Sequence, residues 1–570
     1  MRALDNFFKH IHPIPVYSFL HKASILQRYE AGTVDTGLLL AIIGIASQLT
    51  DLGPGMREYG SECIATAESL VMRDIGKPSV IKIQTLILII NHHKLCRRFT
   101  NAFMLLATAL RFAYALRLNY EASGLCFLAQ ESRRRLMWSL YMLDSTLAGG
   151  IPDMILCRPE ALYIQLPCQE RNFEFDLAQE TEPLKPPRPK QQLAESVGAL
   201  GIYLRVMWLR AQILNATKEI LTADIFDPEH LRRMIESFAE ELDDLHASLP
   251  ASFHFSEKNL HLRAYSTRLC PYMLIHIWWR QCYCDLYRIT LSGLREALPR
   301  AKTTRMDENF YNYCHGQCFD HAKALSDIFK ACVSLKSGLP TMDLEIHSCA
   351  YQCARIIFYI YRHHAAELGL TAASTNDLVK PSLAILENLP ARTVAGDQMQ
   401  DDLRKLIGRG PSEGWSTPSR PATPVGEGDD SNTSKPLSDA SSRQMFSRHS
   451  ILKQMDLVDD SESLAMPSRL NANVHHGQGT ELDPIELQME TIPVDMSVEA
   501  TTGPFLPGQP APASDHMNFT APNAFQGALD GYDFGFDPAT GDAFNWFPGV
   551  WGTGDTPGVM AQPWAMQTEP

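Results

Sequence analysis

Apolar residues recur at spacings of three and four from residue 37 to residue 407, and no alternating, β-branched segment of convincing length interrupts them. This period places apolar side chains on one face of an α-helix, so the pattern predicts an all-α fold. We place helices near 37–52, 54–74, 78–96, 100–119, 128–148, 191–222, 228–246, 262–293, 302–334, 341–367 and 378–407. We expect one large helical domain of about eleven helices, arranged as a single body or as two packed lobes.

The helical pattern ends where the composition changes. Residues 408–470 are rich in Ser, Thr, Pro and Gly, and such a segment is typical of a disordered linker. Residues 471–570 lack a hydrophobic period because Gly and Pro interrupt every apolar run. We therefore divide the sequence into a helical domain in residues 1–407, a disordered linker in 408–470 and a disordered acidic tail in 471–570.

The C-terminal region is acidic, whereas the helical region is nearly neutral. Residues 411–570 hold 22 acidic and 6 basic side chains, and residues 1–410 hold 43 and 45. From Leu470 onward there are 13 acidic residues and no Lys or Arg. Aspartates alternate there with aromatic residues, among them Phe534, Phe536, Phe544, Trp546 and Phe547. This composition is typical of a disordered activation segment that presents its aromatics to a partner, and an inert tail is the alternative.

The sequence offers no catalytic or cofactor-binding motif. It contains no nucleophile elbow, phosphate loop, dinucleotide fingerprint or zinc-protease pair, so we do not expect an enzyme. Thirteen cysteines lie between Cys63 and Cys353, with no pair separated by two residues, and we expect buried free thiols rather than metal ligands. No strongly basic run is present, which argues against nucleic-acid binding by this chain alone. The longest apolar stretches are too short to cross a bilayer, so we expect no membrane association.

The predicted helix 262–293 carries an aromatic cluster that has two interpretations. Its members are Trp278, Trp279, Tyr283 and Tyr287. A mixed aromatic helix can form the wall of a ligand pocket. We expect instead that these side chains pack in the core, because large aromatic residues in a helical domain usually do so.

One short segment carries the most specific set of residues in the chain. It runs from Glu131 to Asp144 and is followed by an Arg-Pro and a Leu-Pro pair. The residues that we single out are Glu131, Arg133, Arg134, Arg135, Trp138, Tyr141, Asp144, Arg158, Pro159 and Pro167. The three consecutive arginines can contact phosphates or pair with internal carboxylates. We expect internal pairing, because arginine commonly joins helices through carboxylates.

This order of residues resembles the middle homology region of fungal binuclear zinc-cluster transcription factors. The shared pattern is an acidic residue, paired arginines, an aromatic residue, Leu-Tyr, an Asp, Arg-Pro and then Leu-Pro. The pair Phe7-Phe8 is also similar to the entry into that domain, and the resemblance covers roughly residues 1–370. Two positions depart from the pattern, since Ser145 stands where a basic residue is usual and Cys157 stands where Gly is usual.

The resemblance implies a nuclear regulator of RNA polymerase II transcription with a helical regulatory or dimerisation domain. Family members usually bind DNA through an N-terminal six-cysteine cluster that holds two zinc ions, and this chain lacks that pattern, so we expect no cofactor in it. DNA is then reached through an upstream cluster missing from this sequence or through a partner. The expected partners are coactivators that bind the tail and a second copy or a related factor. The alternative is a cofactor or dominant inhibitor of related factors that does not bind DNA.

Overall fold

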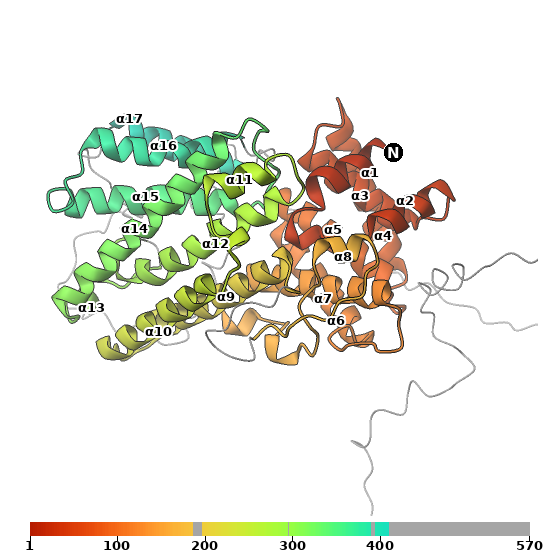
Figure 1. Ribbon diagram of the computed structural model, residues 1–570, viewed down its shortest axis with the longest axis horizontal. Coiled ribbons are helices and arrows are strands. Elements are labelled where there is room, and N and C mark those ends of the chain that lie inside the picture. Colours follow the sequence, from red (N-terminus) through yellow and green to blue (C-terminus); the bar gives the residue numbers. More distant parts are fainter. Residues whose placement is uncertain (186–195, 295, 389–393, 410–570) are drawn as a thin grey trace, which may run out of the picture.

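The computed structural model describes residues 1–185, 196–294, 296–388 and 394–409 (Figure 1). Helices fill most of these ranges, and apart from isolated bridges no β-strand forms within them. The predicted all-α class is therefore confirmed. The predicted tail lies outside the described residues, together with its aromatic residues Phe534, Phe536, Phe544, Trp546 and Phe547, and so does the linker from residue 410 onward.

The helices follow one another with short connections, as labelled in Figure 1. The first group consists of α1 (Arg2–Asn6), α2 (Lys22–Glu30), α3 (Thr36–Leu49), α4 (Met56–Arg73), α5 (Val80–Leu95), α6 (Phe99–Ala115), α7 (Phe127–Ala148) and α8 (Glu170–Glu174). The second group consists of α9 (Ala199–Thr222), α10 (Pro228–Ala247), α11 (Glu257–Arg263), α12 (Leu269–Tyr287), α13 (Arg300–Thr303), α14 (Glu308–Val333), α15 (Ile346–His364), α16 (Ala372–Asn388) and α17 (Val394–Arg409).

The two groups of helices share one core. In Figure 1, α1–α8 lie at one end of the molecule and α9–α17 at the other. In the first group α3 packs against α4 and α5, and in the second group α12 packs against α9 and α14. The two groups meet where α7 contacts α9. Buried apolar side chains from Leu4 to Leu403 form one continuous cluster, so the domain is a single packed body.

Two long helices that we expected are interrupted. The predicted helix 262–293 is divided into α11 and α12. Pro271 explains this break, because proline lacks an N–H and is tolerated in the first turn of a helix, which is where α12 places it. The predicted helix 302–334 is divided into α13 and α14, and the Asp307 side chain caps α14 by accepting from the Phe310 N–H at 2.9 Å.

Other differences from the prediction are smaller. The helix expected at 191–222 is described from Ala199 onward as α9, and the helix expected at 378–407 corresponds to α16 and α17. We did not predict the short helices α1, α2 and α8, which have 5, 9 and 5 residues. Helices of this length show too little of the helical period to be recognised in a sequence.

Helix α7 ends at the glycine pair that follows it. Gly149 has φ 55° and ψ 31°, a left-handed conformation that favours glycine at the end of a helix. Gly150 has φ 79°, and a Cβ atom at this position would lie 2.5 Å from the Cβ atom of Leu214 on α9. The two glycines therefore stop α7 and let the following connection pass directly over α9.

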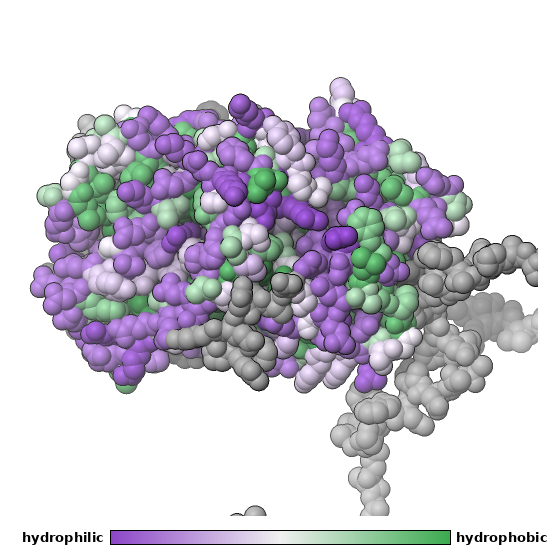
Figure 2. All heavy atoms as spheres, viewed as in Figure 1, coloured by the Kyte–Doolittle hydropathy of each residue, from purple (hydrophilic) through white to green (hydrophobic). Residues whose placement is uncertain are grey.

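Hydrophilic side chains predominate on the face shown in Figure 2, and hydrophobic side chains occur there in small groups. Such a surface is ordinary for a protein that buries one large core. Within the described parts of the chain, no helix combines the length and the apolar character that crossing a bilayer requires.

Candidate functional site

The residues of the motif lie on α7 and on the connection that follows it. Near the start of α7, the Glu131 side chain is completely buried. Its Oε2 atom lies 2.5 Å from Nη1 of Arg134, and its Oε1 atom lies 2.8 Å from Nε of Arg135. Arg134 is also paired with Glu121 through an Nη2–Oε1 distance of 2.9 Å. The buried charges compensate one another, as they must in an interior from which water is excluded.

Arg135 also binds the main chain of two segments that are distant in the sequence. Its Nη2 donates to the carbonyl of Cys168 at 2.9 Å, and its Nη1 donates to the carbonyl of Ser18 at 3.3 Å. Glu131 accepts the Cys168 N–H at 3.0 Å. The Phe173 ring covers the Arg135 guanidinium at 4.3 Å from its centroid. This ion cluster therefore joins α7 to the N-terminal segment and to the connection around Cys168.

Arg133 also forms a hydrogen bond within the domain. Its Nη2 donates to the carbonyl of Leu116, at the end of α6, over 2.7 Å. Arg134 and Arg135 are buried and Arg133 is partly buried. Arg134 and Arg135 thus pair with internal carboxylates as expected, whereas the bond of Arg133 goes to a main-chain carbonyl. The three side chains do not form an exposed triplet that could contact phosphates.

The aromatic residues of the motif hold the same connection further along α7. Trp138 is completely buried, and its Nε1 donates to the carbonyl of Gln165 at 2.8 Å. The Tyr141 ring packs edge-on against Trp138, with ring centroids 5.6 Å apart. Pro167 is buried in the same connection. These side chains serve the fold through packing and one buried hydrogen bond.

Asp144 holds the beginning of the connection. Its Oδ2 atom accepts the N–H groups of Leu156 at 2.9 Å and Cys157 at 2.7 Å. Burial raises the pKa of Asp144 to about 6, although these two N–H groups lower it. The next residue, Arg158, is exposed, and Pro159 begins a single 3-10 turn. Asp144 thus fixes the backbone immediately before Arg158.

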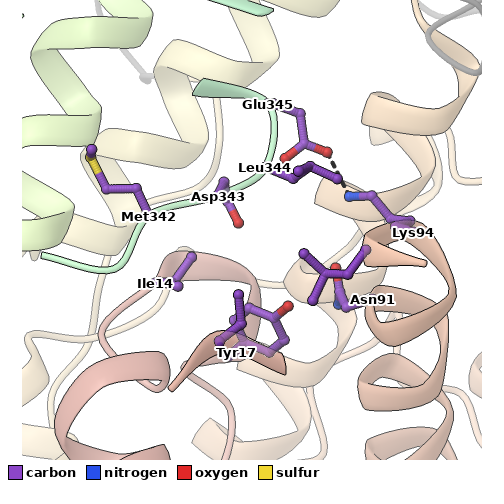
Figure 3. Close-up of a pocket in the computed structure, with 10 residues that line it drawn as sticks. Ile14, Tyr17, Asn91, Lys94, Met342, Asp343, Leu344 and Glu345 are labelled. Carbon is purple, nitrogen blue, oxygen red and sulfur yellow. Dashed lines mark hydrogen bonds and ion pairs between the residues drawn. The ribbon is translucent and has the colours of Figure 1, made fainter. Parts of the chain in front are cut away.

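A second charge cluster, which we did not predict, lies where the two groups of helices meet (Figure 3). Lys94, near the end of α5, lies with its Nζ 2.6 Å from Oε1 of Glu345. Asp343 belongs to the same extended segment as Glu345. Together with Tyr17 and other residues, these side chains surround a cavity of about 10 Å³, roughly the room of one water molecule.

The three charged groups of this second cluster affect one another. Burial and the neighbouring Glu345 raise the pKa of Asp343 to about 7. Burial alone would raise the pKa of Glu345, but Lys94 outweighs it and lowers the pKa of this carboxyl. One lysine therefore neutralises one of two acids, and this ion pair joins α5 to the segment that precedes α15.

The aromatic cluster of α12 occupies the core. Trp278, Trp279, Tyr283 and Tyr287 are all buried. The Nε1 of Trp279 donates to the carbonyl of Leu242 at 3.1 Å, which ties α12 to α10. The core interpretation of these residues therefore agrees with their positions in the structure.

The cysteines do not fit the zinc cluster that the resemblance implies. All thirteen are free thiols, and eleven of the thirteen are buried in the helical domain. Burial raises the pKa of the Cys314 and Cys353 thiols to about 12, which disfavours the thiolate form that binds zinc. Within the described ranges, no group of three or more His, Cys, Asp or Glu side chains is arranged to hold a metal ion.

The chain was compared with known families and proteins. Residues 4–246 match the model of the fungal specific transcription factor domain. The Zn(2)-C6 fungal-type transcription factor FTF1c of Fusarium oxysporum f. sp. lycopersici is 26% identical over 344 residues, which cover 55% of this chain and 36% of that protein. FTF1a of the same organism is 26% identical over 393 residues, covering 64% of this chain and 36% of that protein. No solved structure matches the chain.

The matched region contains part of α1, all of α2–α9 and most of α10, including the motif of α7 and the connection that carries Arg158. The matching segment spans about a third of the length of these curated relatives. The resemblance that rests on the α7 motif and the family match thus agree, and residues 4–246 match the fungal specific transcription factor domain.

Proposed function

We propose that this chain is a nuclear regulator of RNA polymerase II transcription. The observation that carries the proposal is the fungal specific transcription factor domain in residues 4–246, which the chain shares with proteins named as Zn(2)-C6 fungal-type transcription factors. The acidic tail supports it independently, because its composition is the one expected of an activation segment.

The helical domain acts in this proposal as the regulatory or dimerisation part of the protein. Its two charge clusters, one around Glu131 and one around Lys94, hold α7 and α5 to distant segments. A rigid body of this kind can present a surface to a second copy, to a related factor or to a coactivator. The acidic tail supplies further contacts to partners.

The tail recruits coactivators by coupled binding. Phe534, Phe536, Trp546 and Phe547 enter an apolar groove of the partner, and the neighbouring aspartates steer the tail toward basic residues at the rim of that groove. Contact with promoters is made through a partner or through a zinc cluster outside this sequence, since the cysteines present do not fit such a cluster.

A tethering experiment tests the activation role. Residues 471–570 are fused to an unrelated DNA-binding domain, and reporter transcription is measured in a fungal cell. We expect activation, and we expect that replacing Phe534, Phe536, Trp546 and Phe547 by alanine abolishes it, because the apolar contacts are lost while the charge is kept.

A matched control uses aromatics of the same tail outside the cluster. Replacing Phe505, Phe519 and Trp564 by alanine is expected to leave most of the activity. Equal activity of the wild type and the four-residue variant would refute the activation role. A gel shift with the full chain tests the route to DNA, where we expect only weak, salt-sensitive binding without sequence preference.

A further inference from the structure

Three residues of the motif, Tyr141, Arg158 and Pro159, line a half-open pocket of about 410 Å³. The pocket lies between α7, α9, α10 and the connection after α7. Its volume is in the range of sites that bind small molecules, which is about 300–1,000 Å³. Its wall comprises Tyr141, Ser145, Gly150, Pro152, Ile155, Cys157, Arg158, Pro159, Glu160, Trp208, Ala211, Gln212, Asn215, Ala216, Glu219 and Phe238.

Small side chains at the contact between α7 and α9 leave room for this pocket. Ser145 on α7 and Ala211 and Ala216 on α9 stand at positions where a packed helix pair would normally carry larger apolar residues. Gly150 brings the connection directly onto α9, so the pocket is closed at that end. The space therefore follows from the sequence of the two helices and the glycine turn.

A row of polar side chains follows one face of α9 along the pocket. Gln212, Asn215 and Glu219 are separated by three and four residues, so they are neighbours on the helix surface. Nε2 of Gln212 and Oδ1 of Asn215 are buried and have no hydrogen-bond partner among the residues that the structure describes. An unsatisfied buried donor and acceptor cost free energy, and a short rotation of the terminal amide torsion, which is broad for Asn and Gln, would bring both to a ligand.

One cationic and one anionic side chain line the pocket, Arg158 on the connection after α7 and Glu219 within the polar row of α9. Arg158 is exposed, and among the described residues it has no carboxylate partner. Glu160 is the nearest acid in the sequence, but it is paired with Lys185 at 3.6 Å. Glu219 on α9 is likewise exposed and has no ion-pair partner in the described ranges. The pocket thus holds one uncompensated cation and one uncompensated anion.

Three aromatic rings complete the wall. Tyr141 comes from α7, Trp208 from α9 and Phe238 from α10. Aromatic walls favour a planar apolar group through stacked or edge-on packing. The site combines an apolar slot with a donor, an acceptor, a cation and an anion.

We propose that this pocket binds a free α-amino acid with an aromatic side chain. Arg158 and the amide N–H of Gln212 bind the carboxylate of the ligand. Glu219 and the side-chain carbonyl oxygen of Asn215 bind its ammonium group. The aromatic ring of the ligand lies among Tyr141, Trp208 and Phe238. Both ends of a zwitterion are thereby compensated, which neither a simple carboxylic acid nor a simple amine would achieve.

The test measures binding by isothermal titration calorimetry of the full chain with L-tryptophan as the probe. A ligand of this size is expected to bind with a dissociation constant on the order of 0.1 mM. Indole-3-propionate, which lacks the amino group, and L-tryptophanamide, which lacks the carboxylate, are expected to bind at least about tenfold more weakly, because each loses one charged contact.

Two exposed substitutions identify the site without disturbing the core. Arg158→Gln is expected to remove the preference for L-tryptophan over its amide, and Glu219→Gln to remove the preference for L-tryptophan over indole-3-propionate. Ala216→Phe fills the pocket and should abolish binding of all three compounds, provided that circular dichroism shows an unchanged helix content. The proposal is overturned if L-tryptophan produces no binding heat up to about 5 mM, or if both exposed variants bind all three compounds as the wild type does. This readout is independent of transcription, so its failure leaves the proposed function intact.

Discussion

The Lys94→Met substitution is expected to destabilise the helical domain by about 3–5 kcal/mol near neutral pH. The Lys94 and Glu345 side chains are only 7% and 11% exposed and lie 2.6 Å apart, so bulk water does not replace the lost partner. At an effective dielectric constant of about 20, the attraction at that distance is about 6 kcal/mol, and the freedom regained by the side chains reduces the net loss. The variant also leaves Glu345 beside Asp343 without its ammonium partner, which adds repulsion between two acids.

Urea unfolding of the full chain, followed by circular dichroism at 222 nm, measures this loss. The matched control is Lys380→Met, which makes the same change in a pair with Asp377 whose nitrogen and oxygen lie 2.8 Å apart. There the side chains are 64% and 71% exposed, and we expect no measurable change because water solvates both partners. The two pairs have similar distances and differ mainly in burial.

The double variant Lys94→Met, Glu345→Gln separates two causes of the loss. If the penalty comes from an unpaired buried charge, removing the second charge should restore most of the stability. If the penalty comes from lost packing of the lysine stem, the double variant should be no better than the single one. A single-variant loss below about 1 kcal/mol would refute the claim that this pair is buried and holds the two helix groups together.

Two further predictions concern the other buried charges. Arg135→Lys is expected to lower the free energy of unfolding by about 2–3 kcal/mol. An ammonium group cannot bond both Glu131 and the carbonyl of Cys168 as the planar guanidinium does. An unchanged urea midpoint would contradict this prediction. The second prediction concerns Asp343, whose pKa is raised to about 7 by burial and by Glu345, above its value in the unfolded chain. The folded state therefore binds this proton more tightly than the unfolded state does. As a result, the free energy of unfolding should fall as the pH rises from about 4 to about 7. Asp343→Asn should therefore be more stable than the wild type by about 2 kcal/mol at pH 8 and equal to it near pH 4, and thermal unfolding that shows a constant difference over this range would disprove the assignment.

Local signals in the sequence predicted the helices where those signals were strong. The helix expected at 128–148 is found at Phe127–Ala148, because its apolar stripe is long and a glycine pair follows it. The break before α12 was missed although Pro271 marks it, since the apolar period continues across the break. Proline chemistry outweighed periodicity at that point, and Asp307 gave a similar, unused signal for the start of α14.

The candidate site was predictable only in its local part. Glu131, Arg134 and Arg135 are three and four residues apart, so their pairing follows from helical spacing. The bond between Lys94 and Glu345 joins residues 251 positions apart, and no local pattern specifies it. Contacts of this kind arise from the tertiary packing of the two helix groups, which a single sequence does not reveal.

The order of the hydrogen bonds from α7 to the following connection explains what the motif does in the fold. Glu131, Trp138 and Asp144 occupy successive positions along α7, and they bind the main chain at Cys168, Gln165 and Cys157 in that order. The connection thus runs antiparallel to α7 over about 20 Å, given a rise of about 1.5 Å per residue, and is fixed at both ends and in the middle. Arg158 follows the last of these anchors directly, so its backbone is held while its side chain stays exposed at the pocket. If the pocket binds a ligand, Glu131, Trp138 and Asp144 act by positioning the connection, and Arg158 and Tyr141 are the motif residues that contact the ligand.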